Sequence, residues 1–315
     1  MTTVLVSGAA GFIGRHLALA CRSRGWSTTA VDLRPMCLED IETLESDARS
    51  DRLLARIGQG EFDAVLHQAA IADTLENRRG LLHEANVDLP LALAEACARS
   101  GTRFVFASSS SVYGAVGRRE PVPERAVGDA DWCTGPLNEY ARSKLLLEAR
   151  MGQLGGDLPW VGLRYTNVFG AGEQHKGPMA SIMSQILRQA AWFQPVTLFS
   201  DALTAARDYL PVSVLVDTVT RLATTGVPAG IYNLGAGHAV SFAEVLQWCA
   251  AFLEGRSLDA RLVPNAVAGR YQRWTCADMS RLRAALPGAP EIGVDQVRDA
   301  AHLLFRSFQP VPVSG

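Results

Sequence analysis

Short apolar segments alternate with amphipathic segments through the first half of the chain. Strand-like runs occupy residues 4–7, 28–32, 63–67, 103–107 and 160–164, and helical patterns occupy residues 12–24, 80–99 and 137–154. Strands that alternate with helices usually pair in parallel and carry helices on both faces of the sheet. The pattern therefore predicts an α/β protein with a Rossmann-type, doubly wound parallel sheet.

The regular alternation ends after residue 167. Glycine, proline and polar residues interrupt short elements as far as residue 213, and then a strand at 230–234 and helices near 213–225, 241–254 and 294–306 are expected. We interpret the later half as a smaller C-terminal substrate-binding lobe. The predicted organisation is a Rossmann domain over 1–168 completed near 208–240, a lobe from 169–207 and 241–308, and a loose tail over 309–315.

Composition excludes several classes of protein. The net charge of the 315 residues is −2, whereas a nucleic-acid or membrane surface needs a clear basic excess. The N-terminus has no basic and apolar leader, and no long uncharged apolar run is present, so a cytoplasmic protein is expected. The cysteines and histidines are scattered without ligand spacing, so we expect reduced cysteines and no metal site.

Lysine is rare in this chain. Lysine and arginine total 30 residues, but Lys144 and Lys176 are the only lysines. Most exposed cationic positions accept either residue, whereas lysine alone readily shifts its pKa and takes part in proton transfer. Both lysines are therefore candidates for acid–base chemistry; the alternative is two solvated surface charges.

A glycine-rich segment joins the first predicted strand to the first helix. Glycines at such a junction permit a tight turn and close approach of the backbone to a pyrophosphate, while the helix N-terminus supplies N–H donors. This placement favours a dinucleotide site over a plain turn. The contacts expected from the segment are Gly8, Gly11, Phe12, Ile13 and Gly14.

Asp32 ends the second predicted strand. A carboxylate there accepts ribose hydroxyls and repels a 2′-phosphate, which favours NAD, while Arg34 nearby leaves NADP open. The alternative for Asp32 is a turn residue at the strand end. Further expected cofactor contacts are Leu33, Asp47, Gln68, Ala69, Ala70, Asn86 and Val168.

Tyr140 and Lys144 stand four positions apart on a predicted helix, after a serine run at 108–111. Residues with this spacing share one helix face. A nearby ammonium lowers the pKa of a phenol, and a serine hydroxyl can bind the substrate oxygen. The set can remove a proton from an alcohol while hydride leaves to nicotinamide, so Tyr140 and Lys144 are expected to contact cofactor as well. The alternative is an exposed helix pair.

These motifs resemble the extended short-chain dehydrogenase/reductase family over essentially the whole chain. The resemblance rests on the glycine-rich segment, on Ala107 to Gly114, on Tyr140 to Lys144 and on Arg164 to Gly170. It implies that Ser109 is the catalytic serine and that Asn167 contacts substrate. Sugar-nucleotide dehydratases of the family carry Asp-Glu where this chain has Ser110 and Ser111, which argues against dehydration.

Within that family, the chain most resembles the ADP-L-glycero-D-manno-heptose 6-epimerases, in the stretches 173–181, 269–272, 277–279 and 282–285. The resemblance implies that Lys176 is a second acid–base residue opposite Tyr140. An inversion through a ketone needs one base on each face, and hydride return leaves no net redox change. The alternative for Lys176 is a phosphate or cofactor contact without proton transfer.

The resemblance also implies substrate contacts that are less well matched. Arg207 and Tyr271 match residues that hold the diphosphate, although Arg207 could instead pair with Asp208. The family pattern differs at several positions, so the base or sugar can differ, and Asp32 replaces an asparagine. A homo-oligomer is expected by family analogy. The predicted substrate contacts are Ser109, Ser110, Asn167, Lys176, Pro178, Gln185, Phe199, Arg207 and Tyr271.

Two other classes of function are compatible with these motifs. Another sugar-nucleotide epimerase, such as a 4-epimerase, or an oxidoreductase of the same family would share the motifs, but a 4-epimerase turns its sugar past one tyrosine and needs no second base. A non-catalytic NAD(P)-binding sensor would typically lack Tyr140 or Lys144, and this chain has both.

Overall fold

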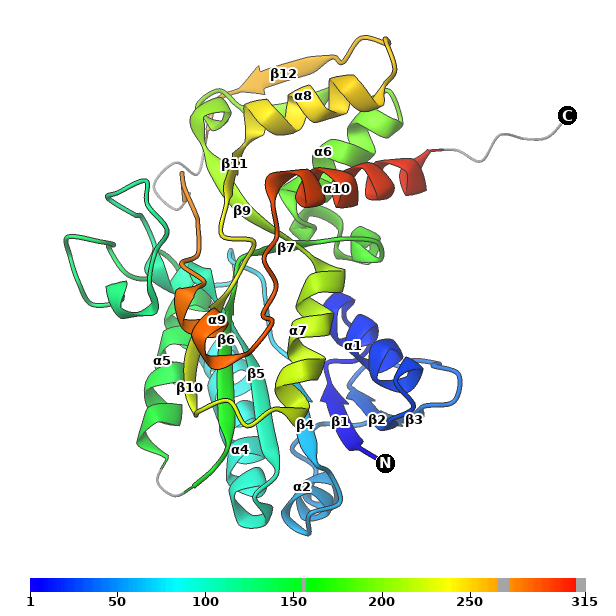
Figure 1. Ribbon diagram of the computed structural model, residues 1–315, viewed down its shortest axis with the longest axis vertical. Helices are drawn as coiled ribbons and strands as arrows, with labels where there is room; N and C mark the ends of the chain where they lie inside the picture. The colour runs from blue at the N-terminus through cyan, green and yellow to red at the C-terminus, as the bar shows by residue number, and fades with distance from the viewer. Residues whose placement is uncertain (155–156, 266–271, 310–315) are drawn as a thin grey trace, which may run out of the picture.

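The computed structural model describes residues 1–154, 157–265 and 272–309. Its centre is a seven-stranded sheet in the order β10-β6-β5-β4-β1-β2-β3 (Figure 1). Every pair in this sheet is parallel, which confirms the expected doubly wound α/β class. The strands are β1 (Thr3–Ser7), β2 (Ser27–Asp32), β3 (Glu42–Glu45), β4 (Ala64–His67), β5 (Arg103–Ser109), β6 (Trp160–Tyr165) and β10 (Gly230–Leu234).

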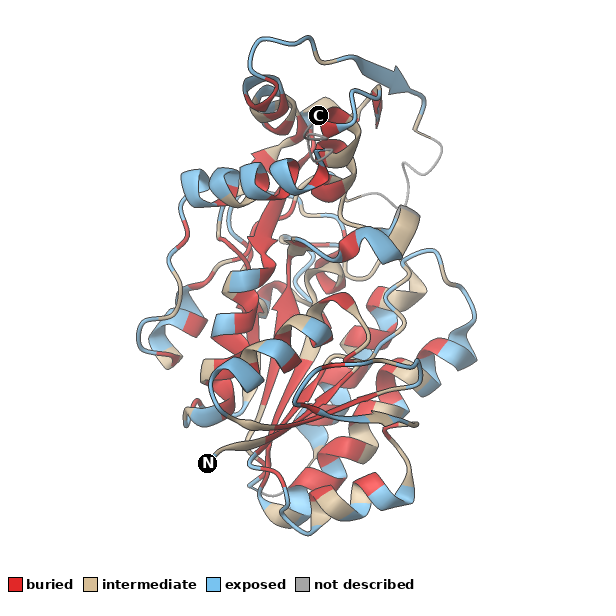
Figure 2. Cartoon of the chain, turned by 90° about the vertical axis from the view of Figure 1, so that its right-hand side faces the viewer, coloured by how far each residue is buried: buried red, intermediate tan, exposed pale blue. Residues whose placement is uncertain are grey.

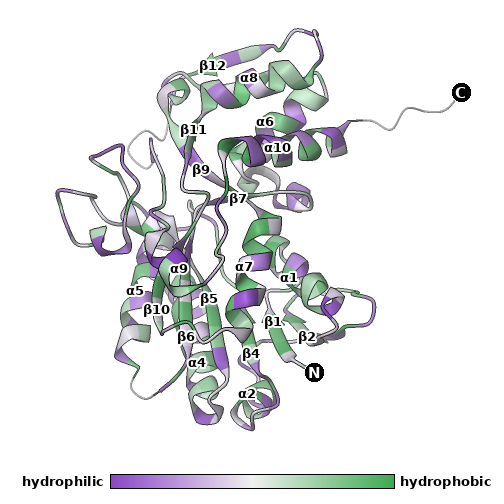
Figure 3. Ribbon diagram, viewed as in Figure 1, coloured by the Kyte–Doolittle hydropathy of each residue, from purple (hydrophilic) through white to green (hydrophobic). Residues whose placement is uncertain are grey.

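Helices cover both faces of the sheet because both faces are apolar. Alternate residues of a strand point to opposite sides. Val4 and Val6 of β1 join a cluster with α1 (Phe12–Ser23) and α7 (Val212–Thr224), whereas Leu5 joins a second cluster with other helices. The helices of that second cluster are α2 (Asp51–Gly58), α4 (Leu89–Ser100) and α5 (Glu139–Gln153). The strands other than the edge strand β3 are accordingly buried and mostly hydrophobic at the centre of the molecule (Figures 2 and 3).

The helix expected over 80–99 is interrupted. It consists of α3 (Arg79–His83), a π-helical turn (Glu84–Asp88) and α4. Pro90 lies in the first turn of α4 and has no N–H for the carbonyl of Asn86, which accounts for a break in the α-helical hydrogen-bond ladder. The break lies next to Ile71, to which Asn86 is hydrogen-bonded and which directly follows the predicted cofactor contacts Gln68, Ala69 and Ala70.

The later half contains more structure than its irregular sequence predicted. The expected helices are present as α7, α8 (Phe242–Phe252) and α10 (Val294–Phe308), and the structure adds α6 (Ile182–Ala191) and α9 (Ser280–Ala285). Two small sheets also form, in the orders β11-β9-β7 and β12-β8. Their strands are β7 (Asn167–Phe169), β8 (Val196–Phe199), β9 (Ala206–Pro211), β11 (Ala239–Ser241) and β12 (Ala260–Val263).

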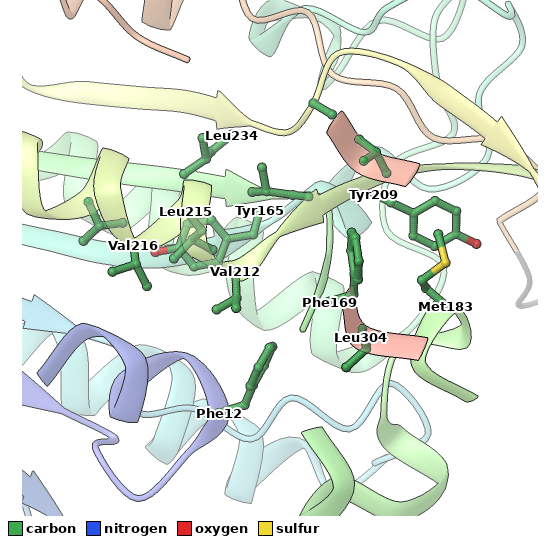
Figure 4. Packing of buried hydrophobic residues seen from close by; sticks show 14 of the residues in the cluster. Phe12, Tyr165, Phe169, Met183, Tyr209, Val212, Leu215, Val216, Leu234 and Leu304 are labelled. Carbon is green, nitrogen blue, oxygen red and sulfur yellow. The ribbon is translucent and has the colours of Figure 1, made fainter. Parts of the chain in front are cut away.

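The hydrophobic core continues from the large sheet into the lobe. Phe12 of α1 and Tyr165 of β6 belong to the same buried cluster as Met183 of α6 and Leu304 of α10 (Figure 4). Segments beyond residue 167 are therefore packed directly on the N-terminal part. The predicted tail, apart from Gln309, lies outside the described residues.

Candidate active site

A cavity of about 690 Å³ opens at the carboxyl ends of β1, β2 and β4. Strand order reverses between β1 and β4, and such a reversal leaves a crevice where dinucleotides bind in doubly wound sheets. Eight predicted cofactor contacts line the cavity: Gly8, Gly11, Asp32, Leu33, Asp47, Gln68, Ala69 and Ala70. Sequence reasoning missed other lining residues, among them Arg49, Ile71, Leu81, Glu84 and Leu89.

Two glycines of the glycine-rich segment leave no space for a side chain. A Cβ atom on Gly14 would lie 2.1 Å from the carbonyl oxygen of Gly8, and one on Gly8 would lie 2.5 Å from the nitrogen of Ala69. Gly11 caps the N-terminus of α1, and no side chain of the described residues caps this turn. Exposed backbone donors at a helix N-terminus bind a pyrophosphate well.

Two polar groups at the cavity also fit a dinucleotide. Asp32 is held by the backbone N–H groups of Ala10 and Arg34, both at 3.0 Å from its oxygens. Gln68 accepts a hydrogen bond from Tyr165 at 3.3 Å, but its buried Nε2 has no partner among the described residues. A buried donor without a partner is costly, and a ligand acceptor would satisfy it.

Asn86 and Val168 do not line this cavity, and neither do Phe12, Ile13 and Gly14. Asn86 instead exchanges hydrogen bonds of 2.9 and 3.0 Å with the backbone of Ile71 and donates to Ser143 on α5 at 3.0 Å. It therefore fixes one wall of the cavity to the helix that carries Tyr140.

The predicted catalytic set meets at the carboxyl end of β5. Asn138 caps α5 by accepting from the N–H of Ala141 at 2.8 Å, which starts the helix just before Tyr140. Lys144 Nζ lies 5.9 Å from the centroid of the Tyr140 ring and donates to the carbonyl of Ala107 at 2.8 Å. Ser109, two residues further along β5, is hydrogen-bonded to Tyr140. The three side chains are thus brought together as expected.

Burial disfavours both the phenolate form of Tyr140 and the ammonium form of Lys144. Burial raises the pKa of Tyr140, and the hydrogen bond from Ser109 partly counteracts it. Burial lowers the pKa of Lys144 to about 8, and the charge of Glu148 partly counteracts that shift. Because each group alone is costly to ionise, a phenolate and an ammonium are best stabilised as a pair.

A buried ion pair that sequence reasoning missed supports the catalytic helix. Arg164 of β6 donates to both oxygens of Glu148 at 2.6 and 2.9 Å, and Ser108 donates to the same carboxylate at 2.5 Å. Arg164 also donates to Tyr113 at 3.0 Å. The available signal was a glutamate four residues after Lys144 and an arginine inside an apolar strand. The network holds α5 against the strand that ends at Ser109.

His67 is a buried neutral imidazole near Lys144. Its Nδ1 lies 2.7 Å from Ser7 Oγ, and burial together with the charge of Lys144 lowers its pKa to about 3. Below the ordinary histidine pKa, the unfolded chain binds a proton that the folded chain excludes, so stability falls with pH from about 6.5 toward 3. Between pH 6 and 4.5 we expect His67 to remove about 2 kcal/mol of unfolding free energy.

The measurement is denaturant unfolding of the native chain and of His67→Gln over that pH range. The variant should lose less stability on acidification than the native chain, whatever its stability at neutral pH. His238→Gln, which changes an exposed histidine, should follow the native chain. Parallel curves for all three proteins would refute the assignment.

Lys176 lies where the lobe meets the cofactor domain. Its Nζ is 3.3 Å from Glu173 and 4.9 Å from the centroid of the Phe12 ring. No hydrogen bond or ion pair of the described residues joins Lys176 to Tyr140 or Ser109. Lys176 therefore adjoins the first helix of the dinucleotide motif, and its action on substrate stays a prediction.

The other predicted substrate residues have varied environments. Arg207 is buried in β9, donates to the Ala206 carbonyl at 3.0 Å and stacks 5.5 Å from the Phe242 ring. The carboxylate of Asp208 accepts from the backbone of Ala236 at 2.7 Å, from Gly237 at 3.1 Å and from Ala277 at 2.9 Å. The local geometry thus gives Asp208 backbone partners of its own.

The remaining predicted substrate residues lie on several elements. Asn167 accepts from Thr275 at 3.3 Å, and Gln185 donates to the Ala180 carbonyl at 2.8 Å. Ser110 lines a small hollow with Thr166 and Thr275, and Phe199 ends β8. Tyr271 and the side chain of Pro178 lie outside the described residues.

Three further findings concern the described part of the chain. It contains no group of three or more histidine, cysteine or acidic residues that could hold a metal ion. None of its helices is long and apolar enough to cross a membrane. All six cysteines are free thiols.

Known proteins resemble this chain over nearly its full length. ADP-L-glycero-D-manno-heptose-6-epimerase from Pseudomonas paraeruginosa is 34% identical, with 90% of this chain and 92% of the relative covered. The protein of the same name from Cupriavidus pinatubonensis is 32% identical, with 93% and 96% covered. These similarities confirm the resemblance inferred from the motifs.

Solved structures agree with this result. The UDP-glucose 4-epimerase of Thermus thermophilus in complex with NAD has a TM-score of 0.79 and 26% identity, covering 97% of this chain and 99% of that one. The Helicobacter pylori heptose epimerase shares the fold, with a TM-score of 0.82 at 24% identity and 96% of each chain covered. The model of the NAD dependent epimerase/dehydratase family matches residues 4–235. The chain therefore belongs to the NAD dependent epimerase/dehydratase family.

Proposed function

We propose that this protein is an NAD-dependent sugar-nucleotide epimerase that inverts C6″ of a nucleotide-activated manno-heptose. The observation that carries the proposal is the combination of two proton-transfer centres. One is the set of Tyr140, Ser109 and Lys144, and the other is Lys176 beside Phe12 of the dinucleotide motif. The similarity to named heptose epimerases supports this substrate class.

Each residue of the site has a separate role in the proposed reaction. Bound NAD supplies a hydride acceptor and later a hydride donor. Tyr140 takes the hydroxyl proton at its phenolic oxygen, Ser109 holds the substrate oxygen, and Lys144 stabilises the phenolate. After the side chain turns, Lys176 gives a proton from Nζ to the oxygen presented on the other face. The hydroxyl is regenerated with inverted configuration, and no net oxidation results.

Incubation with ADP-D-glycero-β-D-manno-heptose in deuterated water tests the function. Proton NMR should show the L-glycero epimer without deuterium at C6″, because hydride returns directly. Deuterium at C6″ would mean that a carbon-bound proton exchanges with solvent, and the mechanism would be wrong. If no conversion occurs, the same assay with other nucleotide bases and sugars tests the positions where this chain differs from the heptose epimerases.

A 4-epimerase is the second candidate, favoured by the similarity to the Thermus enzyme. The variant Lys176→Met separates the two. A heptose 6-epimerase should lose about 100-fold or more in turnover, since a general acid–base group contributes that much. A 4-epimerase needs one tyrosine and should keep its activity on UDP-glucose. The assay compares both substrates with native chain and variant.

We propose that Asp32 makes NAD the preferred cofactor. Asp32→Asn removes the negative charge from the cavity and should weaken NAD binding about tenfold while strengthening NADP binding. Asp47→Asn is the matched control, because Asp47 also lines the cavity and pairs with Arg49 at 3.1 Å, as Asp32 pairs with Arg34 at 3.4 Å. It should affect both cofactors equally. Titration calorimetry with each cofactor measures this, and an unchanged NAD-to-NADP ratio in Asp32→Asn would contradict the assignment.

We also propose a homo-oligomer located in the cytoplasm. The first rests on family analogy and the second on the similarity to the named heptose epimerases. Light scattering of the purified protein measures the number of subunits.

A further inference from the structure

The carboxylate of Glu173 is one of the most enclosed acidic groups in the molecule. Its side chain is 2% exposed, and Lys176 is the only cationic side chain that contacts it in the described part of the chain. Glu173 is the first residue of the 3₁₀ segment Glu173–Met179, which follows β7. Burying an ionised carboxylate requires several donors or a counter-charge.

Those donors come from the start of α6. The N–H of Ser181 donates to Glu173 Oε1 at 3.0 Å, its hydroxyl donates to Oε2 at 2.7 Å, and Ser184 donates to the same oxygen. Ser181 also caps α6. The positive end of the helix dipole further favours a carboxylate here. Glu173 is therefore anchored independently of Lys176.

Lys176 is held less firmly. Its contact with Glu173 is 3.3 Å long, and its side chain is 32% exposed. On the other side its Nζ lies over the ring of Phe12, and cations are attracted to aromatic faces. The next residue, Gly177, has a φ of +53°, a conformation that favours glycine. Glu173 and Phe12 are thus fixed, whereas the Lys176 side chain that contacts both can still move.

We propose that Glu173 is a positioning residue, which keeps the Lys176 ammonium between its carboxylate and Phe12, ready to donate a proton to the substrate oxygen. The proposal rests on the proposed function. The carboxylate and the ring both attract the ammonium, which gives its proton to the substrate oxygen when hydride returns. The proton that Nζ gives to the oxygen is replaced from solvent, which reaches the partly exposed side chain, and Tyr140 returns its own proton to solvent.

The lysine content permits a test that needs no substrate. Lys144 is buried and Lys176 is the only other lysine, so acetylation by limiting acetic anhydride, read peptide by peptide in a mass spectrometer, reports on Lys176 alone. Glu173→Gln should raise the rate of Lys176 acetylation at a fixed pH about threefold, because the side chain loses the ion pair that holds it. Glu173→Asp, which keeps the charge on a shorter arm, should raise it less. Glu61→Gln, which changes a carboxylate paired with Arg56, should leave it unchanged.

Turnover gives the second readout. In the heptose assay Glu173→Gln should lower kcat about tenfold with less than about a threefold change in KM, because ground-state binding is preserved. Glu173→Asp should recover part of kcat. Thermal unfolding of each variant shows whether the chain is folded. If Glu173→Gln fails to fold, the acetylation rate and kcat of Glu173→Asp decide.

The outcomes separate the two proposals. If Lys176→Met loses activity while the Glu173 variants keep the native acetylation rate and the native kcat, the positioning role is overturned. The epimerase proposal then still holds. Full activity in Lys176→Met would show that Lys176 is not the second acid–base residue, and this inference would then be wrong. A higher acetylation rate together with a lower kcat would support both.

Discussion

Replacing Tyr140 with phenylalanine should lower the turnover of the epimerisation about 1000-fold, within the range that general acid–base catalysis contributes. The change removes one oxygen atom, whose contact in the structure is the hydrogen bond with Ser109. The aromatic ring and its packing beside Lys144 remain. We therefore expect an unchanged fold and unchanged binding of NAD, measured by circular dichroism and titration calorimetry, with the loss confined to kcat.

Tyr232→Phe is the matched control. Tyr232 lies in β10, and its hydroxyl donates to the carbonyl of Pro228 at 2.9 Å rather than to a predicted catalytic group. It should turn over at the native rate. If Tyr140→Phe also kept native turnover, another group would be the base and the assignment of this site would be wrong. A joint loss of activity and of thermal stability would indicate a structural role for the hydroxyl.

The first half of the fold followed from the sequence because periodicity and burial agree there. Strands such as β1 and β4 are short apolar runs with both faces covered, and helices such as α5 carry a cap residue just before their apolar stripe. The exposed edge strand β3 gave no comparable signal, and the short helix α2 was missed although its buried Leu53 and Ile57 have helical spacing. Glu42 to Glu45 is mostly polar and exposed, so only its pairing with β2 makes it a strand.

The lobe was underestimated for a different reason. Glycines and prolines between residues 167 and 213 suggested an irregular segment, although Met183, Ile186, Leu187 and Ala190 have helical spacing and line the buried face of α6. The small strands β7, β9 and β11 are three to six residues long. Their order is set by contacts between distant segments, which a local pattern cannot predict.

The candidate site likewise contains residues that the sequence predicted and residues that it did not. Tyr140, Lys144 and the glycine-rich segment are adjacent in sequence or at helical spacing, so local rules placed them. The ion pair between Glu148 and Arg164 depends on how α5 and β6 pack. Glu173 is only three residues from Lys176, but its burial depends on the start of α6, whose serines donate to it. Arg164 places a charged group inside an otherwise apolar strand. That local inconsistency was the available signal, and it identifies residues that support the chemistry.

Replacing Gly14 with alanine should destabilise the protein and abolish most of its affinity for NAD. The new Cβ would lie 2.1 Å from the carbonyl oxygen and 2.7 Å from the carbonyl carbon of Gly8. Both atoms belong to the backbone, so no side-chain rotation can relieve the contact, and α1 must move away from the turn after β1. We expect a loss of about 3 kcal/mol of unfolding free energy, the upper end of overpacking costs.

Displacing α1 also moves its N-terminal N–H groups from the pyrophosphate position, so NAD binding should weaken at least about tenfold. Gly152→Ala is the matched control, because Gly152 also lies in a helix but nothing lies within 4 Å of its Cβ position. Alanine there should leave NAD affinity unchanged and stabilise the helix slightly, since it has the higher helix propensity. Denaturant unfolding and titration calorimetry measure both effects. If Gly14→Ala bound NAD as tightly as the native chain, the cofactor would not depend on the close approach of α1 to Gly8, and the cavity at the carboxyl ends of β1 and β4 would need another ligand.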